Sequence, residues 1–243
     1  MTPLYMVELQ LDLAALQRFL TSQGLSTCLE DDDLGYGVHA WLSAAFGDLA
    51  PKPWRLFVGK GRPPRVLGYG PHDAAALRQR LREFADPSVL QVCAEPDAAV
   101  ASRMMPSWRS GRHVGFEVQC CPVGRKSRTG VEKDLFLVRA DHAGEAGLRR
   151  DAVYCEWVRE QLEQNQAAHV SSIRLEGFRL VRQTRKEKGD GGRRSCRRLV
   201  RPEALLRGEL TVGDPEAFSA LLRRGVGRHR AFGYGMLLLR PIT

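Results

Sequence analysis

The sequence lacks the short motifs of the common metal-dependent and nucleophilic enzymes. Its six cysteines form no Cys-x-x-Cys pair, and its six histidines form neither a His-x-x-x-His nor a His-Glu-x-x-His spacing. Zinc sites and helix-borne metal centres depend on those spacings. A Gly-x-Ser-x-Gly elbow, a Walker loop and a dinucleotide-binding glycine fingerprint are also missing. We therefore expect no metal and no cofactor, so that any catalysis must come from ordinary side chains.

Long apolar runs and a secretory leader are lacking as well. No segment reaches the ~20 apolar residues that cross a bilayer, and the N-terminus has no leader pattern. The cysteine spacing favours reduced thiols. These absences predict a cytoplasmic protein without a membrane partner.

Lysine is scarce beside arginine, and basic residues outnumber acidic ones. The chain carries 37 Lys+Arg against 28 Asp+Glu, which gives a net charge of +9 and a pI near 9.6. A basic balance of this size favours a polyanionic partner, nucleic acid first and an acidic membrane surface second. Arginine suits bidentate contacts to phosphates and bases.

The apolar periodicity predicts the same order of elements in each half of the chain. In the first half we expect strands at 3–11, 54–60, 65–70 and 97–105, and helices at 12–23, 35–46 and 73–85; the acidic run 30–33 would complement the dipole of the second helix. In the second half we expect strands at 112–122, 169–183, 197–212 and 236–240, and helices at 150–164 and 214–224. With the extra helix set aside, both halves read β-α-β-β-α-β. We predict an α+β fold of two tandem ferredoxin-like (RRM-like) domains with antiparallel sheets, at residues 1–108 and 109–243.

A glycine-rich loop, residues 225–235, precedes the last strand. Glycine permits positive φ, and consecutive N–H groups in such a turn can hold an anion. Arginines beside it favour a phosphate-bearing ligand. A plain turn without a ligand is the alternative. The loop residues that we expect to contact a phosphate-bearing ligand are Gly225, Gly227, Arg228, His229, Arg230, Gly233 and Gly235.

Two further segments, 125–133 and 179–201, concentrate basic side chains. Like charge in one hairpin is self-repelling and is better explained by a docked polyanion, although a solvated loop is the alternative. The basic residues that we expect to hold nucleic acid are Arg125, Lys126, Arg128, Lys133, Arg179, Arg182, Arg185, Lys186, Arg193, Arg194, Arg197 and Arg198.

Tyr36 and His39 stand three residues apart in the helix predicted at 35–46, so both side chains lie on one face. RNA cleavage without metal needs a base for the 2′-hydroxyl, an acid for the leaving 5′-oxygen and donors for the phosphorane. Tyrosine and histidine can fill these roles. A helix-start aromatic beside a structural histidine is the competing interpretation.

Together these features resemble the CRISPR-associated repeat-RNA endoribonucleases of the CasE type. The similarity lies in the two ferredoxin-like halves, in Tyr36-x-x-His39 and above all in Gly225-Val-Gly-Arg-His-Arg-Ala-Phe-Gly-Tyr-Gly235 before an apolar strand. No lysine neighbours His39 in sequence to complete a catalytic set, and residues 11–34 have no counterpart in the family pattern. A relative that serves another class of CRISPR effector complex fits the same features.

The resemblance implies a metal-independent cut at the base of a repeat hairpin, with a 2′,3′-cyclic phosphate and a mature crRNA that stays bound. Tyr36 and His39 would be catalytic, and the loop and basic residues named above would contact the RNA. Repeat RNA and other effector-complex subunits would be the partners. The alternative is a non-cutting RNA-binding subunit of a CRISPR ribonucleoprotein complex. A small-molecule enzyme with a phosphate loop leaves the basic hairpin unexplained.

Overall fold

A computed structural model describes residues 2–25, 34–59, 61–125, 131–143, 147–188 and 194–242. The chain forms two compact units. The first is Met1–Met105 with Val181–Val200 and Ala231–Gly233; the second is Pro106–Leu180, Arg201–Arg230 and Tyr234–Thr243. The boundary predicted at 108/109 stays a prediction, and the acidic run 30–33 lies outside the described residues.

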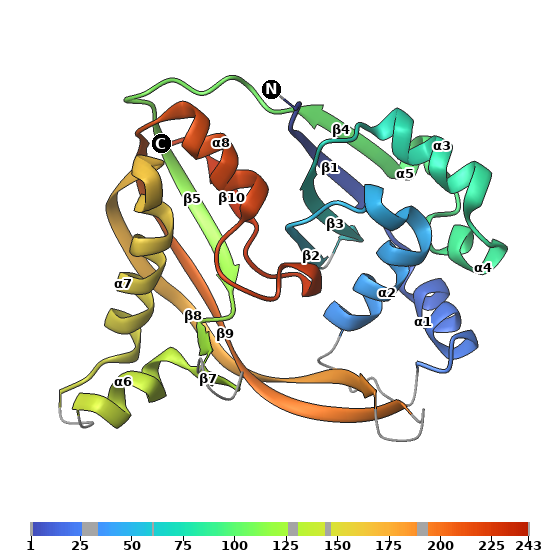
Figure 1. Ribbon diagram of the computed structural model, residues 1–243. Coiled ribbons are helices and arrows are strands. Elements are labelled where there is room, and N and C mark those ends of the chain that lie inside the picture. The colour runs from blue at the N-terminus through green and yellow to red at the C-terminus, as the bar shows by residue number, and fades with distance from the viewer. Residues whose placement is uncertain are drawn as a thin grey trace. The chain divides into compact units, whose positions relative to one another are not determined.

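The first unit contains a four-stranded sheet in the order β2-β3-β1-β4, with antiparallel neighbours (Figure 1). Its strands are β1 (Tyr5–Gln10), β2 (Trp54–Gly59), β3 (Arg62–Gly70) and β4 (Val100–Met104). Its helices are α1 (Leu13–Ser22), α2 (Leu34–Phe46), α3 (Ala74–Phe84), α4 (Pro87–Leu90) and α5 (Pro96–Ala99), with short 3₁₀ turns at Gly47–Leu49 and Gln91–Cys93. This strand order is that of the ferredoxin-like fold, as predicted.

Helices α1 and α2 share one apolar core with the sheet. The Asp12 side chain caps α1 by accepting hydrogen bonds from the amides of Ala14 and Ala15, at 2.8 and 3.0 Å. Gly37 of α2 faces Leu20 of α1, where an added Cβ would lie 2.7 Å from a leucine methyl carbon. The glycine therefore lets the two helices approach closely, which fixes the helix that carries Tyr36 and His39.

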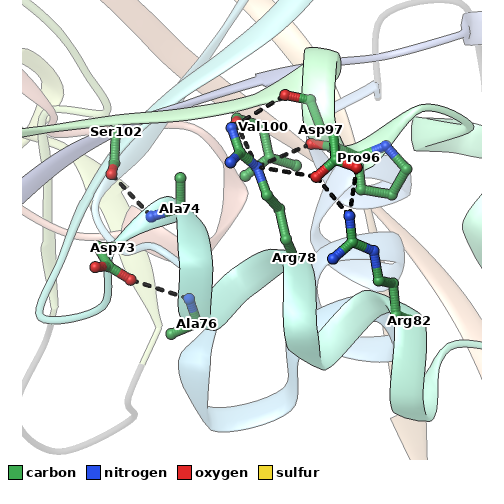
Figure 2. A network of polar contacts seen from close by, with 9 residues as sticks. All are labelled: Asp73, Ala74, Ala76, Arg78, Arg82, Pro96, Asp97, Val100 and Ser102. Carbon is green, nitrogen blue, oxygen red and sulfur yellow. Dashed lines mark hydrogen bonds and ion pairs between the residues drawn. The ribbon is translucent and has the colours of Figure 1, made fainter.

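Arginine side chains tie α3 to α5 and β4 (Figure 2). Arg78 donates hydrogen bonds to the carbonyl oxygens of Pro96, Asp97 and Val100, and Arg82 pairs with the Asp97 carboxylate. At the start of α3, the Asp73 side chain accepts from the Ala76 amide at 2.9 Å. These contacts satisfy carbonyls at the end of α5 and explain arginines in α3 without an RNA role.

The second unit repeats the same strand order in its sheet, β10-β5-β9-β8 (Figure 1). The strands are β5 (His113–Cys120), β8 (Ala168–Lys188), β9 (Arg194–Val212) and β10 (Leu237–Arg240), and the helices are α7 (Arg150–Glu163) and α8 (Pro215–Arg224). Asp214 caps α8 by accepting from the Ala217 amide at 2.7 Å, and Gly225 ends the helix with φ of 71°. The paired strands β8 and β9 form the basic hairpin.

Two regions differ from the sequence prediction. Residues 96–99 form a helical turn that begins at Pro96, so the strand expected at 97–105 begins at Val100. An insertion that the periodicity did not reveal contains β6 (Val123–Arg125), β7 (Glu132–Asp134) and α6 (Leu135–Ala143). Its strands have three residues each, too short to show an alternating pattern.

Candidate functional site

Tyr36 and His39 meet one aromatic ring, Phe232, and all three residues belong to the first unit. The rings of Tyr36 and Phe232 are stacked, with centroids 6.2 Å apart and planes 9° apart. The His39 ring meets Phe232 edge to face, with centroids 4.8 Å apart. The two predicted catalytic side chains therefore lie on one helix face, and a residue of the glycine loop packs against both.

The backbone around Phe232 is held in place by two close contacts. The Trp54 indole donates a hydrogen bond to the carbonyl oxygen of Ala231, at 3.1 Å. At Gly35, an added Cβ would lie 2.6 Å from the Phe232 carbonyl oxygen. The absence of a side chain at Gly35 is thus required for the approach of Phe232 to α2.

His39 is half-buried, and its surroundings favour the neutral imidazole. Burial lowers the pKa of His39, and the positive charge of Lys52 lowers it further. The side chain of Lys52 is exposed, and its backbone amide is fixed by a hydrogen bond to the carbonyl oxygen of Tyr69, at 2.8 Å. Sequence reasoning missed Lys52 because no helical spacing connects it with His39; its one local signal is the run Pro51-Lys52-Pro53.

The glycine loop is built from left-handed backbone, as its composition predicts. Positive φ occurs at Gly225, Gly227, His229, Gly233 and Gly235, between 61° and 89°. Several N–H groups of the loop donate within the protein: the amide of Val226 binds the Gly235 carbonyl at 2.8 Å, and the amide of Gly235 binds the Gln119 carbonyl at 2.7 Å. These two amides are therefore not available to a phosphate.

Two of the loop glycines are required by packing alone. An added Cβ at Gly227 would lie 2.6 Å from the Trp157 ring, and one at Gly235 would lie 2.3 Å from the Val226 carbonyl oxygen. Both glycines therefore have a structural role that needs no ligand.

Arg228 and His229 of this loop converge on Glu132, the acidic residue that opens β7. The Glu132 carboxylate lies 2.7 Å from Nε of Arg228, 2.8 Å from Nε2 of His229 and 2.9 Å from Nη2 of Arg201. We call these four residues the Glu132 cluster; all belong to the second unit. Sequence reasoning placed RNA contacts at Arg228 and His229 but gave no role to Glu132.

Positively charged groups outnumber negatively charged ones in the Glu132 cluster. Burial opposes ionisation of Glu132, but His229, Arg228 and Arg201 outweigh it and lower the pKa of that carboxyl. Burial also lowers the pKa of His229, even though Glu132 acts in the opposite direction. The two guanidinium groups outnumber the single carboxylate, which leaves the cluster net positive.

The other predicted RNA contacts are distributed over both units. Arg179 pairs with Glu203 at 2.6 Å, Lys133 pairs with Asp141, and Arg230 donates to the carbonyl oxygen of Arg224. Arg125 and Arg182 have exposed side chains. The side chains of Arg185, Lys186, Arg194, Arg197 and Arg198, and all of Lys126, Arg128 and Arg193, lie outside what the structure describes.

Within the described residues, no three His, Cys, Asp or Glu side chains gather as they would around a metal ion. No helix in the same ranges is long and apolar enough to cross a membrane.

Two ferredoxin-like sheets form the fold that the sequence resemblance implies. The chain belongs to the family of CRISPR-associated proteins, whose model matches residues 4–241. A curated relative, the CRISPR-associated endoribonuclease Cse3 of Thermus thermophilus, is 27% identical over 204 residues, which cover 77% of this chain and 79% of the relative.

Solved structures share the fold over nearly the whole chain. A CRISPR endoribonuclease Cse3 bound to a 19-nucleotide RNA superposes with a TM-score of 0.60 at 22% identity, over 98% of this chain and 100% of the other. Cas6e from Escherichia coli str. K-12 gives a TM-score of 0.53 at 15% identity, with the same coverage. At these identities the likeness concerns the fold, and it confirms the predicted pair of ferredoxin-like domains.

Proposed function

We propose that this protein is a metal-independent endoribonuclease that cuts CRISPR precursor RNA at the base of the repeat hairpin. The 2′-oxygen attacks the adjacent phosphorus and the bond to the 5′-oxygen breaks, which leaves a 2′,3′-cyclic phosphate and a 5′-hydroxyl. The mature crRNA stays bound. Family membership and the name of the curated relative support RNA cleavage. The observation that carries the chemistry is the lowered pKa of His39, which shares the Phe232 ring with Tyr36 and is affected by the charge of Lys52.

In this mechanism His39 is the general base. Because its pKa is lowered, the imidazole is neutral at physiological pH and can accept the proton of the 2′-hydroxyl. The Tyr36 phenol donates a proton to the departing 5′-oxygen, and the proton held by the His39 imidazolium returns to the phenolate through solvent, so that both groups are restored. The positive charge of Lys52 stabilises the non-bridging oxygens of the phosphorane.

Binding is assigned to the basic side chains. The segments 125–133 and 179–201 hold the hairpin stem, and Arg228 and Arg230 line the RNA at the glycine loop. Other subunits of a CRISPR effector complex would receive the protein together with its crRNA. This assignment predicts binding that weakens steeply with salt, since each phosphate contact releases counterions.

The test uses the repeat-hairpin RNA encoded by the CRISPR array of the same genome, incubated with the protein in EDTA. We expect cleavage at one site and a product with a cyclic phosphate. His39→Ala should abolish most cleavage and leave binding intact, whereas His142→Ala, at an exposed histidine of α6, should change neither. Intact RNA in a saturated complex would instead identify a non-cutting RNA-binding subunit.

A further inference from the structure

We propose that Glu132 is a positioning residue for RNA binding: it holds Arg228 through Nε, so that the two terminal nitrogens of that guanidinium contact an RNA phosphate. The inference rests on the proposed function, because it takes RNA as the ligand. It gives a purpose to the acidic residue that lies within the basic segment 125–133.

The carboxylate of Glu132 is saturated by its protein partners. Oε1 accepts from Nε of Arg228 at 2.7 Å, and Oε2 lies 2.8 Å from Nε2 of His229 and 2.9 Å from Nη2 of Arg201. Arg201 also donates through Nη1 to the backbone carbonyl of Glu132, at 3.2 Å. The Glu132 side chain is only 9% exposed. A carboxylate so enclosed acts on the protein rather than on a ligand.

The two arginines of the cluster differ in exposure. The side chain of Arg201 is 9% exposed and that of Arg228 is 48% exposed. Arg201 therefore serves as the buried counterion of Glu132, while Arg228 reaches solvent. Within the described residues, the hydrogen bond of the Arg228 side chain is made by Nε. Its Nη atoms form the planar fork that matches a phosphate.

The conformation of the loop points to the same role. His229 adopts a φ of 61°, a left-handed conformation that a non-glycine residue adopts at a cost. The hydrogen bond from His229 to Glu132 holds this residue next to Arg228 in the chain. Preorganising an arginine before the ligand arrives reduces the side-chain entropy that binding would otherwise cost.

A masking role for Glu132 makes the opposite prediction. If the carboxylate only neutralised Arg228, its removal would strengthen RNA binding, since a competing negative charge would be lost. If it positions Arg228, the removal should weaken binding because the guanidinium becomes mobile. The direction of the change in affinity therefore separates the two roles.

The experiment measures fluorescence anisotropy of the labelled repeat-hairpin RNA over a series of salt concentrations, with all variants in the His39→Ala protein so that the RNA stays intact. We expect Glu132→Gln to weaken binding about fivefold and to lower the slope of log K against log salt by about one phosphate contact. Arg228→Gln should cause the same loss, and the double variant should add nothing further.

Glu117→Gln is the matched control, because Glu117 forms a similarly enclosed pair with Arg207, with Glu117 11% exposed. It should leave the salt slope unchanged. Should Glu132→Gln prove unfolded by its thermal transition, Glu132→Asp tests the same point: it keeps the charge but withdraws the oxygen from Arg228, so the reduced slope should persist.

An unchanged slope, tighter binding, or additive losses in the double variant would overturn the role of Glu132 and leave the proposed function standing. Absence of RNA binding by the parent protein would overturn both. Binding without cleavage by the protein that retains His39 would overturn the nuclease alone, because the anisotropy experiment does not depend on cutting.

Discussion

His39 and His229 are both partly buried, but they differ in the residues that surround them. Burial lowers the pKa of both imidazoles. His39 meets the aromatic ring of Phe232 and the charge of Lys52, whereas His229 binds a carboxylate that is shared with two arginines. The first environment leaves a neutral base, and the second fixes the imidazole within an ion-pair cluster. In the proposed mechanism, these neighbours, more than burial, assign catalysis to His39 and positioning to His229.

Replacing each histidine in turn with alanine should have the largest effect, and it tests the two roles directly. His39→Ala should lower the rate of RNA cleavage by about 10²- to 10⁴-fold, the usual contribution of a general base, with little change in affinity. His229→Ala should mainly weaken binding, by less than about tenfold, because it loosens the loop next to Arg228. Single-turnover cleavage and anisotropy measure the two effects, and equal cleavage rates for both variants would contradict the division of roles.

A methyl group at Gly35 should disturb the His39 environment without touching His39. In Gly35→Ala the new Cβ would lie 2.6 Å from the Phe232 carbonyl oxygen, so the loop must move away from α2. We expect cleavage to fall more than about tenfold, because small displacements of catalytic groups are costly. Gly61→Ala is the control for backbone strain, since Gly61 has φ of 81° with open space around it. Full activity of Gly35→Ala would show that Phe232 does not position the site.

The contact of Phe232 with α2 could not be predicted from the sequence, unlike several local features. Helical spacing placed Tyr36 and His39 on one face, and turn chemistry identified Asp214, Pro215 and Gly225 as the start and end of α8. These inferences are local. The approach of Phe232 and Lys52 to His39 depends on packing between segments distant in the chain, which no periodicity encodes.

The Glu132 cluster was hidden from the sequence for a related reason. Its members come from β7, β9 and the glycine loop, and β7 has too few residues to be recognised. The basic segment suggested repulsion and therefore an external polyanion. In the structure, a single carboxylate balances part of that charge, which a count of like charges along the sequence does not reveal.

Removing the charge of Lys52 should change how the cleavage rate depends on pH. Since Lys52 contributes to the lowered pKa of His39, Lys52→Met should raise that pKa, and the acid limb of cleavage rate against pH should shift to higher pH. The maximal rate should fall as well, if Lys52 stabilises the phosphorane. His229→Gln is the matched control and should leave the acid limb in place. An unshifted limb in Lys52→Met would mean that the titrating group is not His39.

Acid pH should lower the stability of the protein slightly, and both histidines should contribute to this loss. The pKa values of both histidines are lower in the folded chain than in the unfolded chain. Below about pH 6.5, the unfolded state therefore binds more protons than the native state. The free energy of unfolding should therefore fall as the pH drops through that value. Urea titrations at about pH 7.5 and 5.5 should show a smaller fall for the His39→Gln/His229→Gln variant than for the parent. His142→Gln, at an exposed position, should match the parent; equal losses in all three proteins would assign the acid sensitivity to other groups.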